Sequence, residues 1–169
     1  MKILGEALRR MLSGALTERY PKIKYPAPKG FRGKITINEE KCTGCGACSR
    51  VCPPRAIQVA SEEDHIAVRI LQGKCILCGE CVEACPFGAM SISEEYENTG
   101  DSPTKVMTEV RLKALRCQKC GKAFISQKMY EHVTSILGED YRELAMLCPE
   151  CREKLNAQLI STKILSLKL

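Results

Sequence analysis

The sequence predicts an α+β fold in which a small cysteine-rich domain lies between a helical N-terminal segment and a C-terminal module. Three observations lead to this prediction. Two nineteen-residue segments, starting at Lys41 and Lys74, align without gaps at an offset of 33 and match at eight positions. Apolar residues recur at three- and four-residue steps near both ends of the chain. Short alternating stretches around residues 35–37, 66–70 and 105–112 favour strands.

The N-terminal element is an amphipathic helix predicted over residues 2–16, which carry one continuous apolar stripe. Its other side holds charged residues such as Arg9 and Arg10, so the helix is expected to lie on a surface rather than to cross a bilayer. That surface is either a membrane or partner, or the chain's own domain. A proline-rich strap follows over residues 19–33, because prolines favour an extended path. Residues 1–33 thus form the predicted helix and strap.

The positive charge of the chain is concentrated at this end. Residues 1–34 hold nine Lys or Arg against two Glu, whereas the remainder is close to neutral. Such a segment could contact nucleic acid, anionic lipid or an acidic partner subunit. No stretch has the roughly 20 apolar residues of a membrane span, and the N-terminus lacks a signal-peptide core. We therefore expect a cytoplasmic protein whose twelve cysteines bind metal rather than form disulfides.

The two repeated segments share the cysteine pattern C-x2-C-x2-C-x3-C-P. The two sets are Cys42, Cys45, Cys48 and Cys52, and Cys75, Cys78, Cys81 and Cys85. Three cysteines at two-residue gaps can hold three corners of a cubane, whereas the fourth cannot easily close the same one and in two-cluster ferredoxins binds the other cluster. The pattern therefore predicts a ferredoxin-like domain with pseudo-two-fold symmetry over residues 34–93. Its first 4Fe-4S cluster would use Cys42, Cys45, Cys48 and Cys85, and its second Cys75, Cys78, Cys81 and Cys52.

Such clusters have no open iron corner, so the predicted domain is an electron relay without a catalytic residue. Apolar cover should lower the potentials of the clusters, because it disfavours the added negative charge of the reduced state. The expected cover consists of Ile57, Val59, Ile76, Leu77, Phe87 and Met90. Lys41 and Lys74, beside the first cysteine of each set, should act in the opposite direction.

After a polar linker predicted over residues 94–104, residues 105–169 form the C-terminal module. Helices are expected over residues 126–137, ending at Gly138, and over residues 152–167. Four further cysteines form two C-x2-C pairs, 27 residues apart: Cys117, Cys120, Cys148 and Cys151. Two such pairs are typical of a zinc-ribbon-like site, with mononuclear iron as the alternative. His132 lies between the pairs but is not expected to be a ligand, because four thiolates complete a tetrahedral site.

The strap sequence "GFRGK" and the paired cysteine sets resemble the ferredoxin-type subunit shared by respiratory complex I and energy-converting membrane-bound hydrogenases. The stretch "RLKALRCQKCGKAFISQK", followed by "LCPEC", is similar to the iron-sulfur subunit of formate hydrogenlyase and related hydrogenase-4-type (group 4) complexes. The resemblance implies a relay between an electron-input subunit and the large and small subunits of a NiFe hydrogenase. It places the subunit peripherally on the cytoplasmic side of the cell membrane, with its N-terminal helix on a membrane-arm subunit or on lipid.

Three other functions remain open from the sequence. A complex I-type or other membrane oxidoreductase relay subunit would share the cluster domain. A freely diffusing two-cluster ferredoxin is typically short and acidic, unlike this chain. A nucleic-acid-binding zinc ribbon would leave both clusters without a task and lacks interleaved aromatics, so we expect no nucleic acid partner. Nor is a small-molecule substrate expected, since the donor site for formate, carbon monoxide or ferredoxin would lie on another subunit.

Overall fold

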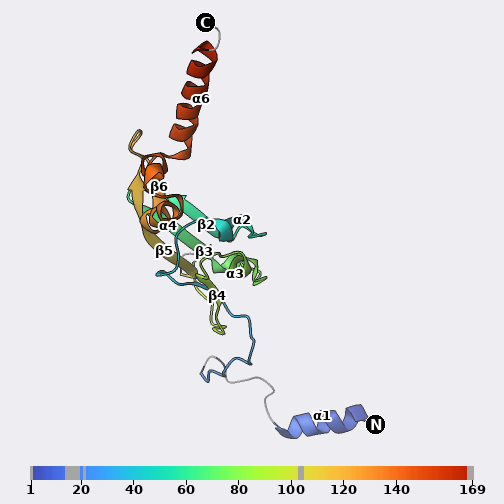
Figure 1. Cartoon of the computed structure of the whole chain (residues 1–169). Helices are drawn as coiled ribbons and strands as arrows, with labels where there is room; N and C mark the ends of the chain where they lie inside the picture. The colour runs from blue at the N-terminus through green and yellow to red at the C-terminus, as the bar shows by residue number, and fades with distance from the viewer. Residues whose placement is uncertain (1, 14–19, 21, 103–104, 167–169) are drawn as a thin grey trace.

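A computed structural model describes residues 2–13, residue 20, and residues 22–102 and 105–166. Helix α1 (Lys2–Ser13) lies at one end of the molecule, and helix α6 (Pro149–Ser166) projects from the other (Figure 1). Both sheets and the cysteine loops lie between them. The predicted N-terminal helix is confirmed as far as Ser13, and its residues 14–16 lie outside the described residues.

In the described residues, six strands form two antiparallel sheets. β1 (Ile35–Ile37) pairs with β4 (Met90–Ile92) in the smaller one. The larger sheet has the order β2-β3-β5-β6, with bounds Ile57–Ser61, His65–Leu71, Met107–Arg116 and Ala123–Ser126. The strands expected around residues 35–37, 66–70 and 105–112 are therefore confirmed as β1, β3 and β5, whereas β2, β4 and β6 were not predicted as strands.

The larger sheet joins the two parts of the chain that lie on either side of the polar linker predicted over residues 94–104. β5 pairs with the whole length of β3, from His65 opposite Lys113 to Leu71 opposite Met107. Residues of the predicted cluster domain and of the predicted C-terminal module thus share one sheet. Residues 94–102 between them form neither helix nor strand. The division of the chain at residues 94–104 stays a prediction.

The element order of the first repeat recurs in the second. After β1 come the first cluster loop (residues 42–48), α2 (Ala47–Arg50) and β2. After β3 come the short 3-10 helix η1 (Gln72–Lys74), the second cluster loop (residues 75–81), α3 (Glu80–Glu83) and β4. The strands pair across the repeats, since β1 pairs with β4 and β2 with β3. This pairing brings the end of each repeat close to the start of the other.

The apolar core lies between the sheets and the cluster loops. Val68 and Ile70 on β3 are almost fully buried, and Val110 and Leu112 on β5 belong to the same apolar core. The first cluster loop packs directly on this sheet at Gly44, whose φ is +69°. A Cβ atom there would lie 3.0 Å from the Leu112 side chain, so both the conformation and the close approach favour glycine.

The strap is attached to the segment that follows β4. Gly33 donates its N–H to the Ser93 carbonyl oxygen at 2.9 Å, and a Cβ atom at Gly33 would overlap the main chain of Glu95. The hydroxyl of Tyr96 donates to the Tyr25 carbonyl oxygen, and Phe31 packs edge-on against the Tyr96 ring. The described part of the strap therefore has a defined seat beside the cluster domain.

The C-terminal helices follow β6. α4 (Gln127–Leu137) begins at Ser126, whose side chain accepts the N–H of Met129, and it ends at Gly138 as predicted. The short helices η2 (Glu139–Tyr141) and α5 (Arg142–Ala145) lead to α6, which begins at Pro149 rather than at the predicted residue 152. Proline suits the first position of a helix, where its missing N–H leaves no bond unmade. In the described part of the chain, no helix has the length and apolar character needed to cross a membrane.

Candidate cluster and metal sites

The first cluster loop surrounds a small cavity. Its walls include apolar side chains from both repeats, among them Val59, Val68 and Phe87. Four cysteines line it, namely Cys42, Cys45, Cys48 and Cys85. The last cysteine of the second repeat therefore lies with the first three cysteines of the first repeat.

A second small cavity is lined by the second cluster loop. Ile35 and Ile57 contribute apolar walls. Its four cysteines are Cys52, Cys75, Cys78 and Cys81. The structure thus brings the predicted ligand sets together in the two groups that crossed ligation requires, because strand pairing across the repeats carries each fourth cysteine to the opposite loop.

Main-chain N–H groups point at the fourth cysteines in the same way in both repeats. The N–H of Ala56 donates to the sulfur of Cys52 at 3.3 Å, and the N–H of Ala89 donates to the sulfur of Cys85 at 3.2 Å. In each case the donor lies four residues after the cysteine. Such donors stabilise negative sulfur, as a cluster-bound thiolate requires.

The thiols alone do not favour the ionised form. Burial raises the pKa of Cys48 to about 12 and that of Cys81 to about 11, and it also raises the pKa of Cys42. Nearby cysteines add to the shift at Cys48 and Cys81, because adjacent thiolates repel one another. Four thiolates in such a cavity therefore need a cationic centre. This donor set fits 4Fe-4S clusters, which would supply reversible one-electron reduction when bound.

The predicted apolar cover is present around the two cavities. Val59, Phe87 and Met90 line the first cavity, Ile57 and Ile76 line the second, and Leu77 packs against the same core. Ile76 therefore lies where it was expected, although 63% of it is exposed. Its counterpart in the first repeat, Thr43, is only 7% exposed, and Ser126 donates a hydrogen bond to the Thr43 carbonyl oxygen. The C-terminal module covers the first loop at this position.

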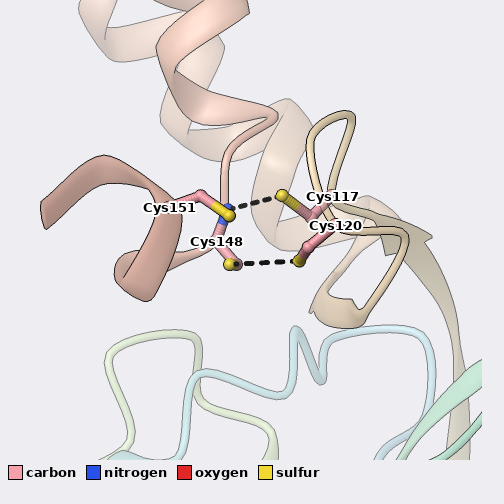
Figure 2. Close-up of side chains that lie close together, drawn as sticks. All are labelled: Cys117, Cys120, Cys148 and Cys151. Carbon is pink, nitrogen blue, oxygen red and sulfur yellow. Dashed lines mark hydrogen bonds between the residues drawn. The ribbon is translucent and has the colours of Figure 1, made fainter. Parts of the chain in front are cut away.

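The four C-terminal cysteines converge at a third place (Figure 2). Cys117 and Cys120 lie between β5 and β6, while Cys148 and Cys151 lie at the start of α6. Their sulfur atoms are all within 4.8 Å of one another, and those of Cys120 and Cys148 are 3.7 Å apart. A tetrahedral ion with sulfur ligands at about 2.3 Å would hold them about 3.8 Å apart. The geometry fits a tetrahedral metal ion.

Hydrogen bonding at this third site favours a bound cation. The N–H of Cys148 donates to the sulfur of Cys117 at 3.3 Å and lowers the pKa of Cys117. Hydrogen bonding with Cys148 raises the pKa of Cys151, so without a metal one sulfur ionises while another keeps its proton. His132 is not part of this site, since its ring packs edge-on against Phe87 with the ring centroids 5.0 Å apart.

Comparison with known proteins gives two kinds of match. Residues 34–86 and residues 74–125 each match a family described as a 4Fe-4S dicluster domain. Over 151 residues, the chain is 35% identical to formate hydrogenlyase subunit 6 of Escherichia coli, and the match covers 84% of both chains. The chain belongs to the formate hydrogenlyase subunit 6 family. It is an iron-sulfur electron-transfer subunit, and members of this family are parts of multisubunit complexes.

Other relatives match a smaller share of the chain. NADH-quinone oxidoreductase subunit I of Carboxydothermus hydrogenoformans is 36% identical over 64 residues, which are 38% of this chain and 46% of that protein. F(420)H(2) dehydrogenase subunit I of Methanosarcina mazei is 34% identical over 59 residues, covering 35% and 33% of the two chains. A chain of the membrane-bound sulfane sulfur reductase, an archaeal respiratory membrane complex, is 31% identical, with a TM-score of 0.45 and coverage of 57% and 53%.

Three residues that contact the cluster loops were not identified from the sequence. Ser126 and Lys128 reach the first loop from the C-terminal module, and Arg32 reaches the second loop from the strap. In the sequence, these three residues stand out only by lying near the end of a predicted helix or of the strap. That position does not indicate which distant residue a side chain contacts.

Proposed function

We propose that this chain relays electrons through two 4Fe-4S clusters between an electron-input module and the NiFe hydrogenase module of a membrane-bound complex of the formate hydrogenlyase type. The observation that carries the proposal is the 35% identity to formate hydrogenlyase subunit 6 over 84% of both chains, which is too long a match to rest on the cysteine loops alone. The cavities support the chemistry, since each collects four cysteines in an apolar setting.

In this proposal the cluster domain has pseudo-two-fold symmetry and crossed ligation. One cluster is bound by Cys42, Cys45, Cys48 and Cys85, and the other by Cys75, Cys78, Cys81 and Cys52. The third cysteine site binds structural zinc, with mononuclear iron as the alternative ion for the same tetrahedral thiolate set. Zinc is favoured because the site ties two chain segments together and has no redox task in the relay.

The proposed location is the cytoplasmic side of the cell membrane, in contact with the hydrogenase large and small subunits. Helix α1 supports peripheral attachment, since its apolar residues Leu8, Met11 and Leu12 are exposed and Arg9 and Arg10 accompany them. Such a helix can dock on a membrane-arm subunit or on anionic lipid. The relay has no nucleic acid partner and no small-molecule substrate of its own.

A second candidate is a relay subunit of a complex I-type or other membrane oxidoreductase. It is favoured by the matches of 36% and 34% identity to subunits of an NADH-quinone oxidoreductase and an F(420)H(2) dehydrogenase. These matches cover little more than a third of the chain and so carry less weight than the longer one.

Affinity purification of the tagged full chain from detergent-solubilised membranes tests both candidates. We expect the hydrogenase large and small subunits to co-purify, with nickel in the complex. Quinone-oxidoreductase subunits without nickel would favour the second candidate. Recovery of the chain as a soluble monomer would contradict both and favour a free ferredoxin carrier.

A further inference from the structure

A cation from a flanking segment bonds the main chain just before the first cluster loop, and another bonds the main chain inside the second cluster loop. The Lys128 ammonium, in the first turn of α4, donates to the carbonyl oxygens of Glu39 and Glu40 at 2.7 and 2.9 Å, just before the first cluster loop. The Arg32 guanidinium, near the end of the strap, donates to the Leu77 carbonyl oxygen inside the second cluster loop at 3.2 Å. One cation therefore serves each loop.

Neither positive charge is paired with a carboxylate in the described part of the chain. Neighbouring lysines of the strap differ, since Lys24 pairs with Glu97 and Lys34 pairs with Glu95. The partners of Lys128 and Arg32 are neutral carbonyl groups, which leave the charge of each cation in place. Among the described residues no carboxylate lies within ion-pair distance of either cation, so the field of each cation can act on the adjacent loop.

We propose that Lys128 and Arg32 are separate tuning residues, each of which raises the reduction potential of the cluster held by the loop it contacts. Reduction adds a negative charge to the cluster, so a nearby cation stabilises the reduced form. The inference rests on the proposed function only in requiring that both loops hold 4Fe-4S clusters.

The charge distribution around the first loop agrees with this role. Lys41 and Lys74, the cations noticed from sequence, are exposed to solvent, where water screens their charge. Arg32 is exposed as well, but its hydrogen bond to Leu77 holds its charge at the second loop, where a smaller effect is expected than that of Lys128. Lys128 is partly buried and hydrogen-bonded in place. It is therefore the stronger candidate at the first loop.

The arrangement also gives the two clusters different surroundings although the repeats are similar. α4 and Ser126 cover the first loop, so that Thr43 is buried, whereas Ile76 at the matching position of the second loop is exposed. Arg32 lies before the cluster domain in the chain and Lys128 lies after it. A substitution in one of these flanking segments can therefore change the reduction potential of one cluster alone. This independence makes the proposal testable without assigning either signal in advance.

The test is a redox titration of the full chain with reconstituted clusters, followed by electron paramagnetic resonance. Lys128→Met and Arg32→Met should each lower the midpoint potential of one cluster, and the two variants should affect different clusters. We expect a change of roughly threefold to tenfold in the equilibrium constant for reduction, about 30–60 mV for a one-electron couple. The charge-keeping variants Lys128→Arg and Arg32→Lys should retain most of the original potential.

Lys113→Met removes an exposed lysine of β5 and is the matched control for net charge. The proposal is overturned if the two Met variants shift both clusters together, or if neither shifts a potential further than the control does. A double variant should show both single shifts, each on its own cluster. Failure of the unchanged chain to bind clusters would overturn the proposed function as well, whereas intact clusters with unmoved potentials would overturn this inference alone.

Discussion

At the scale of single residues, the fourth cysteine of each repeat lies in a different cavity from the first three. Cys42, Cys45 and Cys48 lie in one loop, whereas Cys52 lies in the cavity of the other loop with Cys75 and its neighbours. The N–H of Ala56 holds the Cys52 sulfur in that place. A change at a fourth cysteine should therefore damage the cluster of the opposite repeat.

Serine substitutions test this grouping. Cys52→Ser should remove or alter the same reduced-state paramagnetic signal as Cys78→Ser, because both change one cavity. Cys85→Ser should affect the same signal as Cys45→Ser, and each variant should lose about half of the cluster iron. Electron paramagnetic resonance and iron analysis provide the measurement. Crossed ligation is wrong if Cys52→Ser instead groups with Cys45→Ser.

At the scale of elements, the third cysteine site joins the turn between β5 and β6 to the start of α6. Few apolar side chains support this junction: Phe124 and Leu147 pack against the three buried cysteines. A bound ion would therefore contribute much of its stability, since structural zinc can provide on the order of 10 kcal/mol of folding free energy. The same sheet that carries this site also lies behind the cluster loops, through the pairing of β5 with β3.

Removal of that ion should loosen the C-terminal module while the clusters remain bound. Cys151→Ser should lose one equivalent of zinc per chain and speed amide hydrogen exchange by more than tenfold in the first turn of α6. Exchange in β1 and β4 should stay unchanged. Ser135→Ala, an exposed position of α4, is the control. If the unchanged chain contains no zinc and Cys151→Ser loses one equivalent of iron per chain, the third site binds mononuclear iron instead.

At the scale of the whole molecule, the two sheets and the cysteine loops lie between two helices, α1 and α6, which project at opposite ends (Figure 1). α1 presents exposed apolar residues, with Ile3 86% and Leu8 63% exposed, and it carries Arg9 and Arg10. An apolar stripe of this kind is normally buried against a surface of another molecule. Attachment through α1 would position the clusters without placing any of the described helices across the membrane.

A charge placed on this stripe should weaken membrane attachment. Leu8→Glu should reduce the fraction of the tagged chain in washed membranes several-fold, because burial of a carboxylate is unfavourable. Ser13→Glu adds the same charge on the polar side and should have little effect. Binding to anionic vesicles then distinguishes lipid from a subunit as the docking surface. Equal retention of both variants would contradict attachment through α1.

The local features of the molecule were predictable because their physical signals are local. Cysteine spacing defines which side chains can reach three corners of one cubane, and helical periodicity predicted α1 and α4, with Gly138 at the end of α4. β6 escaped prediction because four residues carry too little periodicity. The exposure of Ile76 also escaped, since an apolar residue beside a cysteine says nothing about what covers it.

The sequence by itself determined the number of cysteine sets, their ligand spacing and the presence of a helix near each end of the chain, because ligand type and spacing along the chain suffice for these. Only the tertiary structure decided which side chains reach the loops from a distance. Ser126 and Lys128 donate hydrogen bonds to residues more than 80 positions away, and Arg32 in the strap donates one to Leu77 in the second cluster loop. Such contacts depend on the pairing of β5 with β3 and on the seat of Gly33 beside Glu95, which no local pattern encodes.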